Sequence, residues 1–357
     1  MRISGPMIGG ELEILAVTHR FGHHKVIDNV TLRVQPGEIL AILGPSGSGK
    51  TTLLNMVGGR LAPEQGDITL GGRSILGLPP DRIDTATVFQ DYALFPHLNV
   101  RDNVGFGLRI RGLPKAQVAQ EVERLLALVG LEDYGGRRIQ QLSGGQRQRI
   151  ATARALAVKP NVLLLDEPMG ALDRQIRGRL QRELAELLRR LHMTTLIVTH
   201  DQDEAFAMAD RIAIMRDGRL EQCDTPDTLY RCPETAFVAT FLGQGTLLTG
   251  QVAPQSGVMG ATSAALADSV SDGGGEQTYL VRPQHVEVAS PGKLADATWR
   301  GACVRSARSF GAQTTLDIEL SGGARLEAAH YGISPFSAGD HVDCRVAPEH
   351  FWRIPQP

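Results

Sequence analysis

The chain has little of what marks several classes of protein. Its 357 residues include four cysteines and no CxxC pair, so we expect free thiols in a reducing compartment rather than a disulfide framework or a zinc site. Aromatic residues make up 5% of the chain and the formal net charge is −2. Few rings for base stacking and no basic excess argue against a nucleic-acid partner.

Long apolar runs are also missing. No stretch approaches the length of a membrane span, and the N-terminal "MRISGPMIGGELEILAV" has no continuous apolar core of a signal peptide. We therefore expect a cytoplasmic protein that contacts a membrane only through a partner.

What is present predicts two domains. From residue 12 to 243, short apolar runs such as "EILAIL", "NVLLLDE" and "TTLIVTH" alternate with amphipathic stretches, which is typical of an α/β fold. A stretch rich in Gly, Ser and Ala follows, and then short alternating segments separated by turns. Residues 245–357 are therefore predicted to form a small all-β domain with an OB-like barrel.

The stretch "GPSGSGKT" matches the pattern G-x-x-x-x-G-K-[ST] between a predicted strand and a predicted helix. Its glycines let backbone N–H groups converge, and the helix adds its positive end, so the loop is predicted to hold nucleotide phosphates. Lys50 would reach the β- and γ-phosphates, and the hydroxyl of Thr51 would bind Mg²⁺. The predicted binding residues are Gly44, Pro45, Ser46, Gly47, Ser48, Gly49, Lys50, Thr51 and Thr52.

Acidic and polar residues follow other predicted strands. Asp166 and Glu167 end "NVLLLDE", where Asp166 would reach Mg²⁺ and Glu167 would polarise an attacking water. Gln90 and His200 also stand at strand ends, and each could instead bond a loop backbone. Asp201 and Glu204 have the spacing of a helix capping box.

A second Ser/Gly-rich helix start occurs in "QLSGGQRQRIATARALA". Ser143 and Gln146 have capping-box spacing, but Gly144 and Gly145 weaken a helix by roughly 1 kcal/mol each relative to alanine. A cap does not need them, whereas an anion close to the backbone does. Because Gly44–Thr52 already encloses the chain's own nucleotide, we interpret this anion as the γ-phosphate bound to a second copy in a C2 pair.

The order of these motifs, "GPSGSGKT", Gln90, "LSGGQ", "LLLDEP", "ALD" and His200, resembles the ATP-binding subunit of ABC transporters over the whole first domain. The resemblance implies a P-loop NTPase fold with a helical subdomain at about 91–160, which uses ATP and Mg²⁺. It makes Glu167, His200 and Gln90 the catalytic residues. It makes Thr51, Gln90 and Asp166 the Mg²⁺ ligands.

Further roles follow from the same resemblance. Phe21 corresponds to the aromatic residue that stacks on adenine, although a core position was the alternative from the residues alone. Ser143, Gly144, Gly145 and Gln146 belong to the signature that meets the partner's ATP. Asp173, in "ALD", corresponds to the D-loop aspartate.

The C-terminal segment "LVRPQHVEV" is similar to the TOBE-type domain of importer ATPases. It implies an import complex with integral membrane permease subunits and, indirectly, a solute-binding protein, with the chain peripheral on the cytoplasmic side of the inner membrane. "VFQDYALFPHLNVRDNVGFGL" looks most like the polyamine, ferric-iron and phosphonate groups, with sugar and sulfate/molybdate importers as the alternative. A soluble ABC ATPase not coupled to transport is the rival from another class.

Overall fold

The computed structural model describes residues 9–170, 174–250 and 277–355, and the chain divides into two compact units, Met1–Pro226 and Asp227–Pro357. The first unit holds a six-stranded sheet in the order β10-β9-β3-β8-β7-β6 and a four-stranded antiparallel sheet in the order β2-β1-β4-β5. Within the larger sheet only β10 is antiparallel to its neighbour. The strands are β1 (Leu12–Phe21), β2 (His24–Val34), β3 (Ile39–Leu43), β4 (Gln65–Leu70), β5 (Arg73–Ser74), β6 (Thr85–Val88), β7 (Val162–Asp166), β8 (Thr195–Thr199), β9 (Arg211–Arg216) and β10 (Arg219–Asp224).

The three predicted apolar strands are confirmed as β3, β7 and β8. Every residue of β3 and β8 is buried, which explains why these segments are continuously apolar rather than alternating. Because β6, β7, β8 and β3 run parallel, their carboxyl ends meet at one edge of the sheet. Ligands of open α/β sheets bind at that edge.

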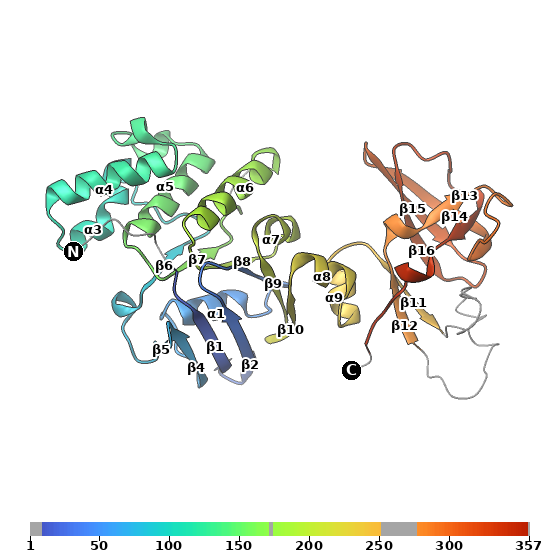
Figure 1. Cartoon of the computed structure of the whole chain (residues 1–357), viewed down its shortest axis with the longest axis horizontal. Helices are drawn as coiled ribbons and strands as arrows, with labels where there is room; N and C mark the ends of the chain where they lie inside the picture. Colours follow the sequence, from blue (N-terminus) through green and yellow to red (C-terminus); the bar gives the residue numbers. More distant parts are fainter. Residues whose placement is uncertain (1–8, 171–173, 251–276, 356–357) are drawn as a thin grey trace. The chain divides into compact units, whose positions relative to one another are not determined.

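Helices of the first unit lie between these strands in sequence. Figure 1 shows α3, α4 and α5 grouped together. In α4 the apolar residues Val118, Val122 and Leu125 are buried, which is the pattern of a helix packed on one face. The helices are α1 (Lys50–Val57), α2 (Val100–Val104), α3 (Phe106–Ile110), α4 (Lys115–Leu128), α5 (Gly144–Ala157), α6 (Arg174–Arg190) and α7 (Gln202–Met208). Among the described helices of the chain, none has the length and apolarity to cross a bilayer.

The second unit is a small all-β domain preceded by two short helices. Its strands pair as two antiparallel sheets, β11-β12-β18 and β13-β17-β14-β15-β16. The elements are α8 (Pro226–Arg231), α9 (Ala236–Phe241), β11 (Thr246–Gly250), β12 (Gln277–Val281), β13 (Glu287–Ala289), β14 (Trp299–Ser309), β15 (Gln313–Glu319), β16 (Arg325–Tyr331), β17 (His341–Arg345) and β18 (Trp352–Arg353).

The boundary between the two compact units comes earlier in the chain than the change in composition near Gly243. α9 and nearly all of α8 belong to the second unit. The buried guanidinium of Arg282, which follows β12, holds them there. It donates to the carbonyl oxygens of Tyr230 at 2.8 Å, Ala239 at 3.0 Å and Gln244 at 3.2 Å, and it stacks on the Tyr230 ring. Carbonyls at helix ends lack partners within the helix, so one cation satisfies several of them.

Replacing Arg282 with Ala removes these bonds and leaves the carbonyls of Tyr230 and Ala239 short of partners. Since an unsatisfied buried polar group costs about 1–3 kcal/mol, we expect R282A to lower the free energy of unfolding of this unit by about 3 kcal/mol. Both tryptophans, Trp299 and Trp352, lie in this unit, so their fluorescence in urea reports on it alone. The control is R305A, which breaks an exposed ion pair with Glu319 and should leave the transition nearly unchanged. Equal midpoints for R282A and R305A would contradict the role of Arg282.

Candidate functional site

The predicted phosphate loop, Gly44–Thr52, joins β3 to α1 at the carboxyl edge of the sheet. Gly47 and Gly49 have φ angles of 82° and 96°, a conformation that glycine adopts without strain. A Cβ on Gly44 would lie 2.2 Å from the Met215 carbonyl oxygen, so that position admits only glycine. Gly49 gives α1 no side-chain cap, which leaves the first N–H groups of the helix to an anion. The loop therefore fits a phosphate group.

Lys50 lies folded into this loop, with 7% of its surface exposed. Its Nζ donates to the carbonyl oxygens of Gly44 at 2.8 Å and Pro45 at 2.7 Å. Burial lowers the pKa of the ammonium, and the Glu167 carboxylate partly opposes this effect. A phosphate would offer Lys50 a charge-assisted partner in place of neutral carbonyls.

Asp166 ends β7 beside the same loop. Burial raises the pKa of its carboxyl group, the neighbouring Glu167 raises it further, and Arg60 lowers it. Two adjoining carboxylates at a half-buried position favour a divalent cation, whose charge would stabilise both ionised forms. Asp166, with the Thr51 hydroxyl and the Gln90 amide oxygen, therefore provides oxygen donors of the kind that Mg²⁺ prefers.

Gln90, Glu167 and His200 meet across three neighbouring strands. The Gln90 amide donates to Glu167 Oε2 at 2.9 Å, and His200 Nδ1 lies 2.8 Å from Glu167 Oε1. Glu167 itself has a φ of 45°, an uncommon conformation for a residue with a side chain. The structure thus places the three predicted catalytic residues in one hydrogen-bonded group next to Asp166, and both oxygens of the Glu167 carboxylate are held.

The segment after Gln90 is held by a residue that the sequence analysis missed. Tyr92 and Ala93 both have positive φ angles, of 66° and 44°. Their carbonyl oxygens accept bonds from the Arg154 guanidinium of α5, at 2.9 Å and 2.7 Å. An arginine among the small buried residues of "IATARALA" is the signal that could have indicated it. The Tyr92 side chain is 3% exposed and so contributes almost nothing to the surface of this segment.

Ser143 begins α5 with the predicted capping box. Its Oγ accepts from the Gln146 backbone N at 3.3 Å, and its own N donates to Gln146 Oε1 at 2.9 Å. Among the described residues, the hydrogen bonds of these two side chains stay within the cap and the Tyr134 hydroxyl, and none reaches the phosphate loop. A Cβ on Gly145 would lie 2.8 Å from Leu180 of α6, so close helix packing is a second reason for a glycine there.

Two predicted residues stand apart from this group. Phe21 at the end of β1 is 55% exposed and makes a T-shaped ring contact with His19, at 4.8 Å between centroids. Its exposure argues against the alternative of a core position. Asp173 lies outside the described residues.

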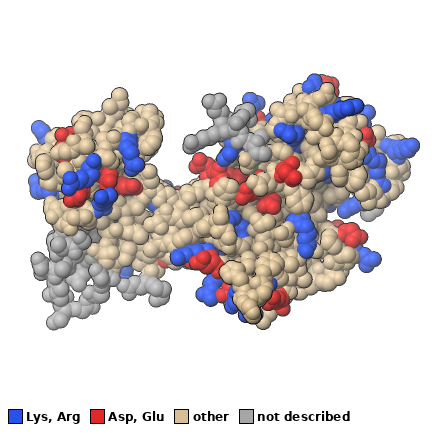
Figure 2. Space-filling view, turned by 180° about the vertical axis from the view of Figure 1, so that it is seen from behind, with Lys and Arg blue, Asp and Glu red and all other residues tan. Residues whose placement is uncertain are grey.

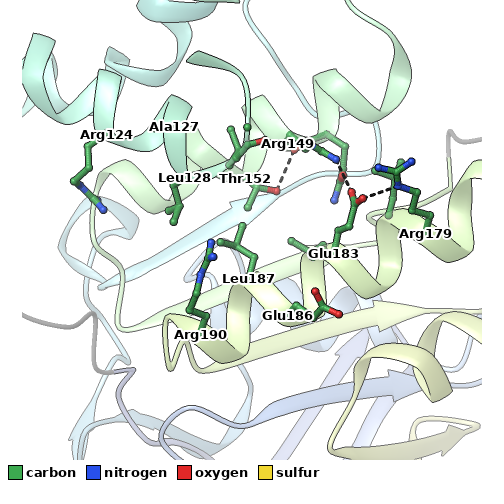
Figure 3. Close-up of a pocket in the computed structure, with 15 residues that line it drawn as sticks. Arg124, Ala127, Leu128, Arg149, Thr152, Arg179, Glu183, Glu186, Leu187 and Arg190 are labelled. Carbon is green, nitrogen blue, oxygen red and sulfur yellow. Dashed lines mark hydrogen bonds and ion pairs between the residues drawn. The ribbon is translucent and has the colours of Figure 1, made fainter. Parts of the chain in front are cut away.

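A cavity of about 900 Å³ between α4, α5 and α6 is a separate feature. Figure 3 shows Glu183 bridging Arg149 and Arg179 along its wall. Burial raises the pKa of the Glu183 carboxyl, but the two guanidiniums outweigh burial and lower it overall. None of the phosphate-loop residues lines this cavity.

The described residues on the face drawn in Figure 2 form no large patch of one charge sign. Lysine and arginine side chains are interspersed with aspartate and glutamate there. Such a mixed face differs from the continuous basic stripe that tracks a nucleic-acid backbone.

Comparison with known proteins agrees with this geometry. A family described as "ABC transporter" matches residues 27–170, and one described as "TOBE domain" matches residues 279–354. The chain is 42% identical over 347 residues to a spermidine/putrescine import ATP-binding protein of Pseudomonas aeruginosa, covering 93% of this chain and 95% of the relative. A protein of the same description from Nitratidesulfovibrio vulgaris is 40% identical over 338 residues, covering 90% of this chain and 89% of the relative.

A sulfate/thiosulfate import ATP-binding protein of Mycobacterium bovis is 47% identical over 265 residues, which cover 74% of this chain and 76% of the relative. Relatives named for different solutes thus match this chain over most of its length. The chain belongs to the ABC transporter ATPases that drive import by ATP hydrolysis and carry a C-terminal TOBE domain.

Proposed function

We propose that this chain energises the uptake of a polyamine-type solute, by hydrolysing ATP between two copies of itself that are bound to membrane permease subunits. The observation that supports a polyamine as the solute is the share of this chain that aligns with each relative. The two polyamine relatives described above align over 93% and 90% of this chain, and the sulfate/thiosulfate relative aligns over 74%. Sulfate or thiosulfate is the second candidate, because identity within the shorter match is higher, at 47%.

The proposed reaction begins with binding of the nucleotide phosphates at Gly44–Thr52. Lys50 leaves the carbonyls of Gly44 and Pro45 for phosphate oxygens, and Phe21 stacks its exposed ring on the adenine. Mg²⁺, when bound by Thr51, Asp166 and Gln90, neutralises phosphate charge that develops during the transfer.

Glu167 then accepts the proton of a water that attacks the γ-phosphate. General-base catalysis requires a carboxylate held at a defined position, and the bonds to Gln90 and His200 supply that restraint. His200 is exposed, with 61% of its side chain accessible. In this proposal its Nε2 contacts the phosphate.

The Ser143–Gln146 cap serves the second copy in this proposal. Its bonds are internal and its residues are partly exposed, so it is accessible to a nucleotide held by another chain. Two copies related by a two-fold axis would each complete the other's site.

For the catalytic role, we expect Glu167→Gln to lower kcat for ATP by a factor of about 10³ or more, because the amide cannot take the proton of the attacking water. ATP binding should persist, since the phosphate loop is unchanged, and an ATP-bound dimer should accumulate. Steady-state hydrolysis and light scattering with ATP and Mg²⁺ measure both effects. Monomeric E167Q with wild-type turnover would exclude Glu167 as the base.

Sharing of sites between copies is tested by mixing two inactive variants. K50A lacks the phosphate-binding cation and S143E places a negative charge at the cap. In a mixed dimer, one composite site carries both defects and the other carries neither, so ATPase activity should reappear on mixing. If each chain used its own cap, the mixture would stay inactive.

The solute is tested by reconstitution with the co-purifying permease subunits and solute-binding protein in vesicles. We expect spermidine or putrescine to raise the ATPase rate several-fold, because solute-loaded binding protein favours the closed dimer. Matched reactions receive sulfate and thiosulfate. Stimulation by the oxyanions alone would replace the polyamine assignment and leave the ATPase role intact.

A further inference from the structure

Two buried polar atoms without hydrogen-bond partners flank the Gln90–Glu167–His200 group. Tyr92, two residues after Gln90, is 3% exposed, and Glu204, in the first turn of α7 after His200, is 2% exposed. The Tyr92 hydroxyl and Glu204 Oε1 are buried with no partner in the described part of the chain. Because such atoms cost about 1–3 kcal/mol each in a native structure, their presence on both sides of one site requires a reason.

Glu204 does not act as the capping residue that its spacing predicted. Asp201 caps α7 by accepting from the Glu204 backbone N at 3.2 Å, but the Glu204 carboxyl group turns inward to the Thr199 hydroxyl. That hydroxyl in turn accepts from the Asp201 backbone N at 3.0 Å. Glu204 therefore holds both residues that flank His200.

The charges around Glu204 oppose its ionisation. The pKa of Glu204 is raised to about 7, and burial is the largest cause. The charges of Asp201 and Glu167 raise this pKa further. The hydrogen bond with Thr199 and the charge of Arg177 lower it. Arg177 is bonded to Asp201 at 2.6 Å. From the segment after Gln90, Tyr92 lies close enough for the Glu204 charge to act on its hydroxyl.

We propose that Glu204 is a positioning residue of the ATPase. It fixes His200 through Thr199 and the start of α7. When the segment after Gln90 closes on nucleotide, Glu204 also bonds the Tyr92 hydroxyl. The inference rests on the proposed roles of Gln90 and His200. A neutral carboxyl group can donate its O–H to the Tyr92 oxygen while it accepts from Thr199. One contact would thus satisfy both orphan atoms and connect the two segments that hold Glu167.

The ionisation of Glu204 gives the first test. In the folded chain the carboxyl keeps its proton up to about pH 7, whereas a carboxyl in the unfolded chain loses it near its ordinary value of 4.5. The folded state therefore binds more protons across this window, and stability from this group falls as pH rises from 4.5 to 7. We expect kcat to decline as pH rises through 7 and the Glu204→Gln variant to lack this decline.

E204Q is the informative variant because its amide keeps both hydrogen bonds and cannot ionise. At pH 6 its kcat should stay within about twofold of wild type. The matched control is Glu121→Gln, a buried glutamate of α4 that pairs with Arg124 and should keep the wild-type pH profile. A wild-type pH decline in E204Q overturns the inference.

A double-mutant cycle tests the contact with Tyr92. E204L and Y92F should each lower kcat about tenfold with the KM for ATP within about twofold, and the double variant should be no slower than either. Multiplied losses in the double variant, or wild-type kcat in E204L, also overturn the inference. E167Q separates the two proposals. If it hydrolyses ATP at the wild-type rate, the proposed role of Glu167 as the base fails, and if it is inactive while the Glu204 results are negative, only this inference fails.

Discussion

The two hydrogen bonds of the Glu167 carboxylate are the interaction on which the rest of the site depends. They join residues that are 77 and 33 positions away in the chain and follow three different strands. The bonds require β6, β7 and β8 to be parallel neighbours, because only then do the three strand ends meet at one edge. The fully apolar strands that bury this sheet are thus the structural condition for the catalytic geometry.

Around that site, arginine side chains and residues with positive φ angles restrain the neighbouring segments. Arg154 fixes the carbonyls of Tyr92 and Ala93, and Arg60 lies close enough to lower the pKa of Asp166. Positive φ angles at Tyr92, Ala93 and Glu167 persist only where the surroundings enforce them. The proposed catalysis needs such restraint, because a loosely held loop would leave the attacking water unoriented.

The second unit depends on a comparable device. The Arg282 guanidinium donates hydrogen bonds to carbonyl oxygens at the ends of α8 and α9 and to that of Gln244. Burial lowers the pKa of this guanidinium. These hydrogen bonds explain why a boundary placed by composition near Gly243 differs from the boundary of compactness after Pro226. Composition follows the stretch rich in Gly, Ser and Ala, whereas packing follows the contacts that the buried Arg282 makes.

The sequence by itself determined the α/β class, the central strands and the glycine-rich loop before α1, and it singled out Glu167 as a carboxylate at a strand end, whereas Gln90 and His200 rested on the family resemblance. The strands, the loop and the caps follow from local patterns, since strand burial, glycine at positive φ and helix capping are set by neighbouring residues. Only the tertiary structure decided that Glu204 turns inward, that Arg154 holds the segment after Gln90, and that Tyr92 is buried. Each depends on side chains far apart in the chain meeting in a low-dielectric interior, where burial and pairing set their charge and their bonds.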